Sequence, residues 1–303
     1  KMNNEQIQKE LEIINFPIQI QTIAGIPEEM GRKVVRLDHA PATPLGIVGS
    51  RYQPINHMEA FGGAIKSMQL GGLDFTDAKL DVSSYENGAM AKMELLLPAH
   101  NEKVGTHDLS LKYVARNSYN GRWKFQGFFG WMNHVCFNTL VTGQKLAYTA
   151  NRHTKSFDID ASNKKITNAV NAVTSATGAF QRWWDTKVED DAVANMFEKT
   201  VAKMPLSQGA KMVAKSETNK KQLYILMGLY NEEVKQLHGS GDYGRKDAKG
   251  SLWCAYQAST AWSTHLSDIT IREKGKQHIV QYQRQNEVRK MLTSNYWSEL
   301  EYA

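Results

Sequence analysis

A β-hairpin is the feature of this sequence that most constrains its fold. Apolar and polar residues alternate over residues 109–116 and again over residues 122–126, and the turn-forming residues 117–121 lie between the two stretches. Alternation with a period of two residues is typical of strands whose two faces meet different surroundings. We therefore predict two antiparallel strands joined by a short turn.

The two faces of this hairpin are expected to differ in chemistry. The alternation places the cations of the hairpin on one face and most of its rings on the other. Two interpretations follow. In one, the hairpin edge and its turn at Tyr119 contact a bound strand; in the other, the rings are core and binding depends on charge alone.

Positive charge is concentrated around the same hairpin. Between His107 and Lys155 there are seven lysines and arginines and one acid, Asp108, so this segment carries the whole formal net charge of +6. The same segment contains nine aromatic residues. Single-stranded nucleic acid needs cations along its phosphates and flat side chains for its bases, and this combination favours such a partner.

The rest of the chain predicts an α+β fold, with a hairpin-rich antiparallel sheet in the N-terminal half and a mainly helical C-terminal half. Residues 80–85 and 90–96 form strand-like runs around Glu86-Asn87-Gly88, an Asn-Gly hairpin signal. After Asn163 the apolar spacing becomes helical, and residues 286–300 are expected to form one amphipathic helix. We expect residues 1–160 and 161–303 to pack together as one domain.

The candidate binding residues belong to this basic, aromatic segment. We expect phosphate contacts from four hairpin cations and two flanking ones, and base stacking from three rings. The cations are Lys112, Arg116, Arg122, Lys124, Arg152 and Lys155, and the rings are Tyr119, Trp123 and Phe125.

Other kinds of site have weaker support. His134, Cys136 and His153 are possible metal ligands, but the sequence shows no fourth ligand and no standard zinc spacing. The glycine-rich loop at residues 239–246 follows a predicted helix, so a Rossmann nucleotide site is excluded, and no Walker loop occurs. We expect no enzyme activity, no cofactor and no metal.

Composition predicts a protein of a reducing compartment. The two cysteines are too few for a disulfide framework, and no apolar run approaches the length of a membrane span. The N-terminus lacks the basic and apolar regions of a signal peptide. These features predict a cytoplasmic protein that does not enter a membrane.

Four short stretches resemble a family of phage and plasmid proteins known as domain of unknown function nine-three-two. They are Val48-Gly49-Ser50-Arg51-Tyr52 with Glu59-Ala60-Phe61, Asn117-Ser118-Tyr119-Asn120-Gly121, Val135-Cys136-Phe137-Asn138-Thr139-Leu140, and the stretch from Trp253 to His265. Asn120 and Phe137 depart from the family pattern, which usually has Asp and Ser there.

This resemblance implies a protein of a mobile element, located in the cytoplasm of its host cell. The family is remotely similar to single-strand annealing proteins, which implies a homo-oligomer that binds single-stranded DNA and anneals strands without ATP in replication or recombination. A metal-assisted enzyme acting on nucleic acid stays open as an alternative. So does a structural or virion protein whose rings form subunit interfaces.

Overall fold

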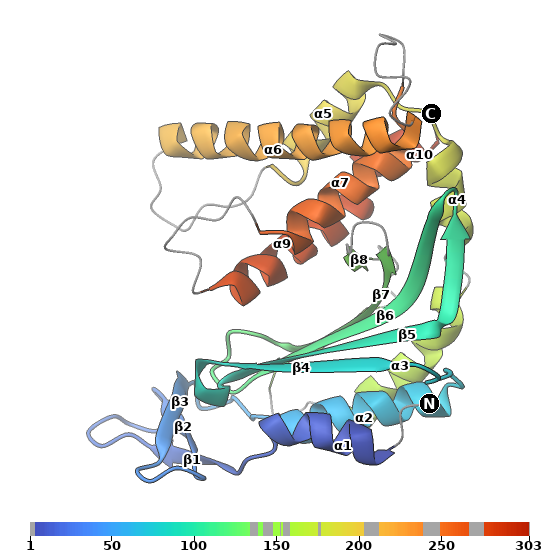
Figure 1. Cartoon of the computed structure of the whole chain (residues 1–303). Coiled ribbons are helices and arrows are strands. Elements are labelled where there is room, and N and C mark those ends of the chain that lie inside the picture. Colours follow the sequence, from blue (N-terminus) through green and yellow to red (C-terminus); the bar gives the residue numbers. More distant parts are fainter. Residues whose placement is uncertain are drawn as a thin grey trace. The chain divides into compact units, whose positions relative to one another are not determined.

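The structure, a computed structural model, describes residues 4–133, 139–141, 148–151, 153, 158–174, 177–202, 212–238, 249–266 and 276–302 (Figure 1). Its strands are β1 (Ile18–Thr22), β2 (Arg32–Arg36), β3 (Thr43–Val48), β4 (Lys79–Tyr85), β5 (Met90–Val104), β6 (His107–Ser118), β7 (Phe125–Asn133), β8 (Thr139–Val141) and β9 (Tyr148–Asn151). Its helices are α1 (Asn4–Leu11), α2 (His57–Leu70), α3 (Ile159–Thr174), α4 (Thr177–Asp185), α5 (Asp190–Lys199), α6 (Met212–His238), α7 (Leu252–Thr264), α9 (Gln277–Leu292) and α10 (Asn295–Glu301). The predicted α+β class is confirmed.

The chain divides into two compact units, and each unit uses several stretches of sequence. The first contains Lys1–Asn101, Ser110–Gly130 and Gln144–Ser175, and the second contains Glu102–Leu109, Trp131–Gly143 and Ala176–Ala303. Strands β5, β6 and β7 therefore contribute residues to both units.

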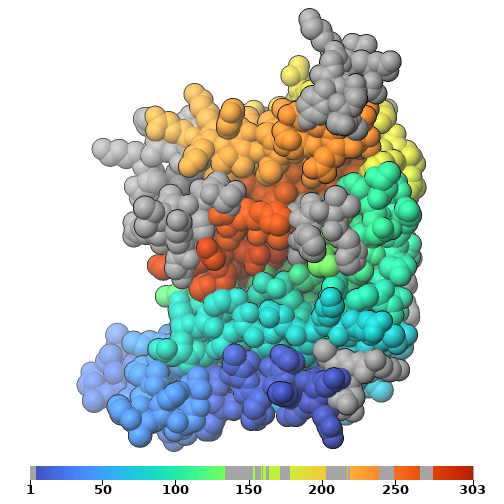
Figure 2. Space-filling view, in the orientation of Figure 1, coloured from blue at the N-terminus to red at the C-terminus, as the bar shows by residue number. Residues whose placement is uncertain are grey.

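The strands form two sheets. In the smaller sheet the strand order is β1-β2-β3, and both pairs of strands are antiparallel. The residues of this N-terminal part of the chain are coloured blue in Figure 2, where they lie at the surface. In the larger sheet the order is β4-β5-β6-β7-β8, and β9 pairs with β7. Lys79 lies opposite Leu96 and Tyr85 opposite Met90, so the hairpin predicted around Glu86-Asn87-Gly88 is confirmed.

Helix α2 packs in the first unit and forms for recognisable local reasons. Its N-cap is Asn56, whose side chain accepts a hydrogen bond from the Met58 amide at 2.8 Å. Its buried apolar residues recur every three or four positions. Figure 1 shows α2 and α3 along the larger sheet, and the Thr167 hydroxyl joins them by donating to the Ser67 carbonyl oxygen at 3.2 Å.

Helix α7 forms the centre of the second unit. Every residue from Leu252 to Ser263 is buried, which is the pattern of a helix surrounded by other elements. Its rings belong to an aromatic cluster in which the Trp183 and Tyr256 centroids lie 5.0 Å apart. Trp183 is therefore a packing residue.

The helix expected over residues 286–300 is two helices, so that prediction was wrong. Helix α9 ends at Leu292 and α10 begins at Asn295. The Ser294 hydroxyl accepts a hydrogen bond from the Trp297 amide at 3.3 Å, which provides the N-cap of the new helix. No helix in the described parts of the chain is long and apolar enough to cross a bilayer.

Candidate nucleic-acid interface

The three rings expected to stack on bases lie in the protein interior. Tyr119, Trp123 and Phe125 are each at most 1% exposed. Tyr119 belongs to a core cluster that includes Phe16, and its hydroxyl accepts a hydrogen bond from the His57 amide at 2.9 Å. Rings buried in this way offer no face to a base, so the stacking role expected for them is corrected to a role in the core.

The expected separation of cations from rings is also corrected. Arg116 is 1% exposed, and its guanidinium carbon lies 6.0 Å from the centroid of Trp123 and 5.7 Å from that of Phe128. Trp123 precedes β7 and belongs to the turn, which the Ser118 hydroxyl closes by donating to the Trp123 carbonyl oxygen at 2.8 Å. Because the turn interrupts the strand alternation, Trp123 lies on the same side as Arg116.

One face formed by β4, β5 and β6 nevertheless carries several charged side chains. The antiparallel register of β4 and β5 aligns Asp81 with Glu94, and Glu94 contacts both Lys92 Nζ and Lys112 Nζ at 2.9 Å. Since alternate residues share a face, the part of this face that lies in the first unit, here called the basic face, holds four cations and two carboxylates. Its members are Lys79, Asp81, Ser83 and Tyr85 on β4, Lys92 and Glu94 on β5, and Ser110, Lys112 and Arg116 on β6.

The electrostatics of the basic face follow from its partial burial. Burial acts to raise the pKa of Glu94, but the nearby charges of Lys92 and Lys112 outweigh it and lower the pKa to about 2. Burial also lowers the pKa of Lys92, although Glu94 acts against that change. A desolvated face with an excess of cations favours an anionic partner.

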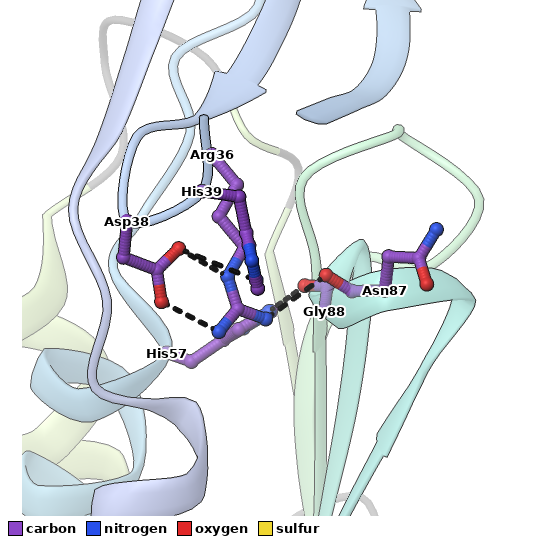
Figure 3. A network of polar contacts seen from close by, with 6 residues as sticks. All are labelled: Arg36, Asp38, His39, His57, Asn87 and Gly88. Atoms are coloured by element: carbon purple, nitrogen blue, oxygen red, sulfur yellow. Dashed lines mark hydrogen bonds and ion pairs between the residues drawn. The ribbon is translucent and has the colours of Figure 1, made fainter. Parts of the chain in front are cut away.

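The turn between β4 and β5 has an unusual backbone. Glu86, Asn87 and Gly88 have φ angles of 51°, 59° and 97°. Two side chains hold this turn, as Figure 3 shows: His57 Nε2 lies 3.0 Å from the Gly88 carbonyl oxygen, and Arg36 Nη1 donates to the Asn87 carbonyl oxygen at 3.1 Å.

His57 belongs to a buried polar network. The Asn117 side-chain amide donates to His57 Nδ1 at 2.9 Å and to the Ile55 carbonyl oxygen at 2.9 Å, which leaves Nε2 to donate to Gly88. Burial lowers the pKa of His57 to about 3, so the ring is neutral. The hydroxyl of Tyr52 donates to the Ser118 carbonyl oxygen at 2.6 Å, so the first two family-like stretches meet here.

The turn between β6 and β7 carries the two exposed cations of the hairpin. Arg122 and Lys124 both lie at the surface. The Glu86 carboxylate reaches across from the other turn, where it accepts a hydrogen bond from Asn120 Nδ2 at 3.1 Å and forms an ion pair with Arg122 Nη1.

Several predicted residues lie outside the described parts of the chain. These are Arg152 and Lys155 of the binding set, and His134 and Cys136 of the possible metal set. His153 is buried, its ring centroid lies 5.0 Å from that of Tyr52, and burial lowers its pKa to about 4. The described residues contain no group of three or more potential metal ligands.

Sequence reasoning missed the contribution of β4 and β5 to the basic face. Lys79, Lys92 and Tyr85 lie outside the segment with the charge excess, and Tyr85 is only half-buried, with its ring edge-on to Trp123 at 6.0 Å. The signal was present in the alternation of residues 79–85, which places Tyr85 on the face of Lys79.

Comparison with known protein families identifies the family of this chain. Residues 44–291 match Domain of unknown function (DUF932). The match covers most of the chain and begins within β3, after α1, β1 and β2. No curated protein and no solved structure matches the chain.

Proposed function

The chain belongs to the DUF932 family, and from that premise we propose that it binds single-stranded nucleic acid, DNA in preference, through the phosphates. The observation that carries this proposal is the basic face, where Lys92 and Lys112 both contact Glu94 and Lys79 is exposed on the same face. Phosphate contacts supply most of the affinity in sequence-independent binding.

Tyr85 supports a single strand as the partner. It is half-buried on the basic face, near Arg116, and its ring meets that of Trp123 edge-on. Base stacking on such a ring contributes about 1 to 3 kcal/mol per base, and a duplex does not offer its bases in this way. Exposed Arg122 and Lys124 extend the positive charge to the β6–β7 turn.

The same proposal includes strand annealing without ATP in a phage or plasmid, inside the host-cell cytoplasm. It rests on the resemblance to single-strand annealing proteins, and the basic face supplies the chemistry that annealing needs. Phosphate neutralisation reduces the repulsion between two strands, and this step requires no nucleotide hydrolysis.

Binding of labelled oligonucleotides at several salt concentrations tests the proposal. The wild-type protein should bind a single strand more tightly than the matching duplex, and fluorescence anisotropy measures both. In Lys112→Gln, affinity should fall, and the slope of log affinity against log salt should decrease in magnitude by about 0.7, the value for one lost phosphate contact on a single strand. Glu94 keeps Lys92 as its partner in this variant, so the fold should persist.

The matched control is Lys66→Gln. Lys66 is exposed on α2, outside the basic face, and its loss should leave both affinity and salt slope unchanged. Equal losses in the two variants would show that binding depends only on the overall charge. Absence of oligonucleotide binding by the wild-type protein at low salt would refute the proposed function.

A further inference from the structure

Glu86 occupies a backbone conformation that suits glycine better than glutamate. Its φ angle of 51° lies in the left-handed region, as do those of Asn87 and Gly88. Glycine has no penalty there and asparagine is well tolerated, but a glutamate is strained. The left-handed backbone therefore accounts for Asn87 and Gly88, but it gives no reason for a glutamate at position 86.

The contacts of the Glu86 side chain lie at the protein surface. Its carboxylate contacts Arg122 Nη1 and Asn120 Nδ2, but the Glu86 and Arg122 side chains are 36% and 50% exposed. An exposed ion pair contributes only about 0.2 to 1 kcal/mol. The Arg122 guanidinium therefore holds the Glu86 carboxylate only weakly.

The two donors that meet Glu86 are held in place by their own turn. The side-chain oxygen of Asn120 accepts a hydrogen bond from the Arg122 amide at 3.1 Å, so its Nδ2 is directed outward. Asn120 also packs closely against β3, because a Cβ at Gly46 would lie 2.6 Å from the Asn120 Cβ. The amide and the guanidinium therefore form a pair of donors that suits the oxygens of a carboxylate or a phosphate.

We propose that Asn120 and Arg122 form a phosphate-binding site, that Glu86 occupies this site in the free protein, and that a phosphate of the nucleic-acid chain displaces it. This inference rests on the proposed function, since the site extends the basic face to the β6–β7 turn. Displacement is possible because the ion pair is exposed to water and therefore weak.

Glu86→Gln tests this inference because it keeps the size of the side chain and removes the competing charge. Affinity for a single-stranded oligonucleotide should rise by about 1.4- to 5-fold, which is the ion-pair range of 0.2 to 1 kcal/mol converted to a ratio. The gain should disappear in the double variant Glu86→Gln/Arg122→Gln. Glu86→Gly should bind more tightly than wild type as well, and should also unfold at a higher urea concentration because the backbone strain is relieved.

A purely structural role for Glu86 predicts different results. If the carboxylate only links the two turns, both single variants should unfold more easily and neither should bind more tightly. Inorganic phosphate tests the chemistry of the site: at an ionic strength where chloride has no effect, it should compete with the oligonucleotide and abolish the gain. A gain that phosphate and chloride reduce equally would show that Asn120 and Arg122 form no phosphate-binding site.

The two proposals fail in different ways. If the wild-type protein binds no oligonucleotide, the proposed function is wrong. If the wild type binds and Glu86→Gln binds equally or more weakly, only the displacement of Glu86 is wrong.

Discussion

His57 is buried among groups that use both of its ring nitrogens. Asn117 donates to one nitrogen, the Gly88 carbonyl oxygen accepts from the other, and the ring lies 3.9 Å from that of Tyr119, centroid to centroid. A proton on Nδ1 would remove the acceptor that Asn117 needs and would place a charge in the core. The network that supports the β4–β5 turn therefore requires a neutral histidine.

This requirement predicts that stability falls in acid. The pKa of His57 is about 3 in the folded protein and about 6.5 when unfolded, so the unfolded state binds more protons below pH 6.5. The stability contributed by the neutral ring is present above pH 6.5 and is lost as the pH falls toward 3, at up to about 1.4 kcal/mol per pH unit. Urea unfolding between pH 7.5 and 4.5, followed by tryptophan fluorescence, measures this slope.

The comparison variant is His57→Gln. It should be less stable than wild type at pH 7.5, because the ring packing is lost, but its stability should depend less steeply on pH. His153, whose folded pKa is about 4, should maintain part of the slope in both proteins. Identical slopes would show that His57 titrates normally in the folded state.

At the scale of elements, close packing between β6 and β7 sets which residues the hairpin can hold. A Cβ at Gly127 would lie 1.9 Å from the Tyr113 hydroxyl, and the Tyr113 ring is packed against Phe129 at 4.9 Å between centroids. Tyr113 is buried and cannot move aside cheaply. Position 127 must therefore be glycine because of a cross-strand neighbour.

Gly127→Ala should lower the free energy of unfolding by about 1 to 3 kcal/mol, the usual effect of overpacking a core. The control is Gly62→Ala on α2, where nothing lies within 4 Å of the added Cβ. That variant should gain stability, up to about 1 kcal/mol from helix propensity alone. The midpoint of thermal unfolding should thus fall below that of the wild type in Gly127→Ala and rise above it in Gly62→Ala. Shifts in the same direction would contradict this account.

At the scale of the whole molecule, the charge excess and the basic face coincide only in part. Lys112 and Arg116 come from the segment that carries the net charge, whereas Lys79 and Lys92 come from the part of the chain that is neutral overall. The basic face therefore forms only when the two hairpins pair. Binding should consequently be lost when the protein unfolds, unlike binding by a basic tail.

Exposed apolar side chains on the first unit predict self-association. Ile47 on β3 is 70% exposed and Met30 is 77% exposed, and Gly31, the residue after Met30, lies against Ile47. Light scattering should give a molar mass above that of one chain, and Ile47→Asp should lower it. Leu70→Asp, at a 74% exposed position on α2, is the control and should not change it. A monomeric wild-type protein would contradict this expectation.

The sequence by itself determined the α+β class, both hairpins and the mainly helical C-terminal half, because alternation and helical spacing are properties of residues close together in the chain. Only the tertiary structure decided which side of each strand is covered. Phe16 helps to bury Tyr119, and Glu94 pairs with Lys112, although neither partner is near in sequence. For the same reason, the competition between Glu86 and a phosphate at Arg122 could not be predicted from the residues in order.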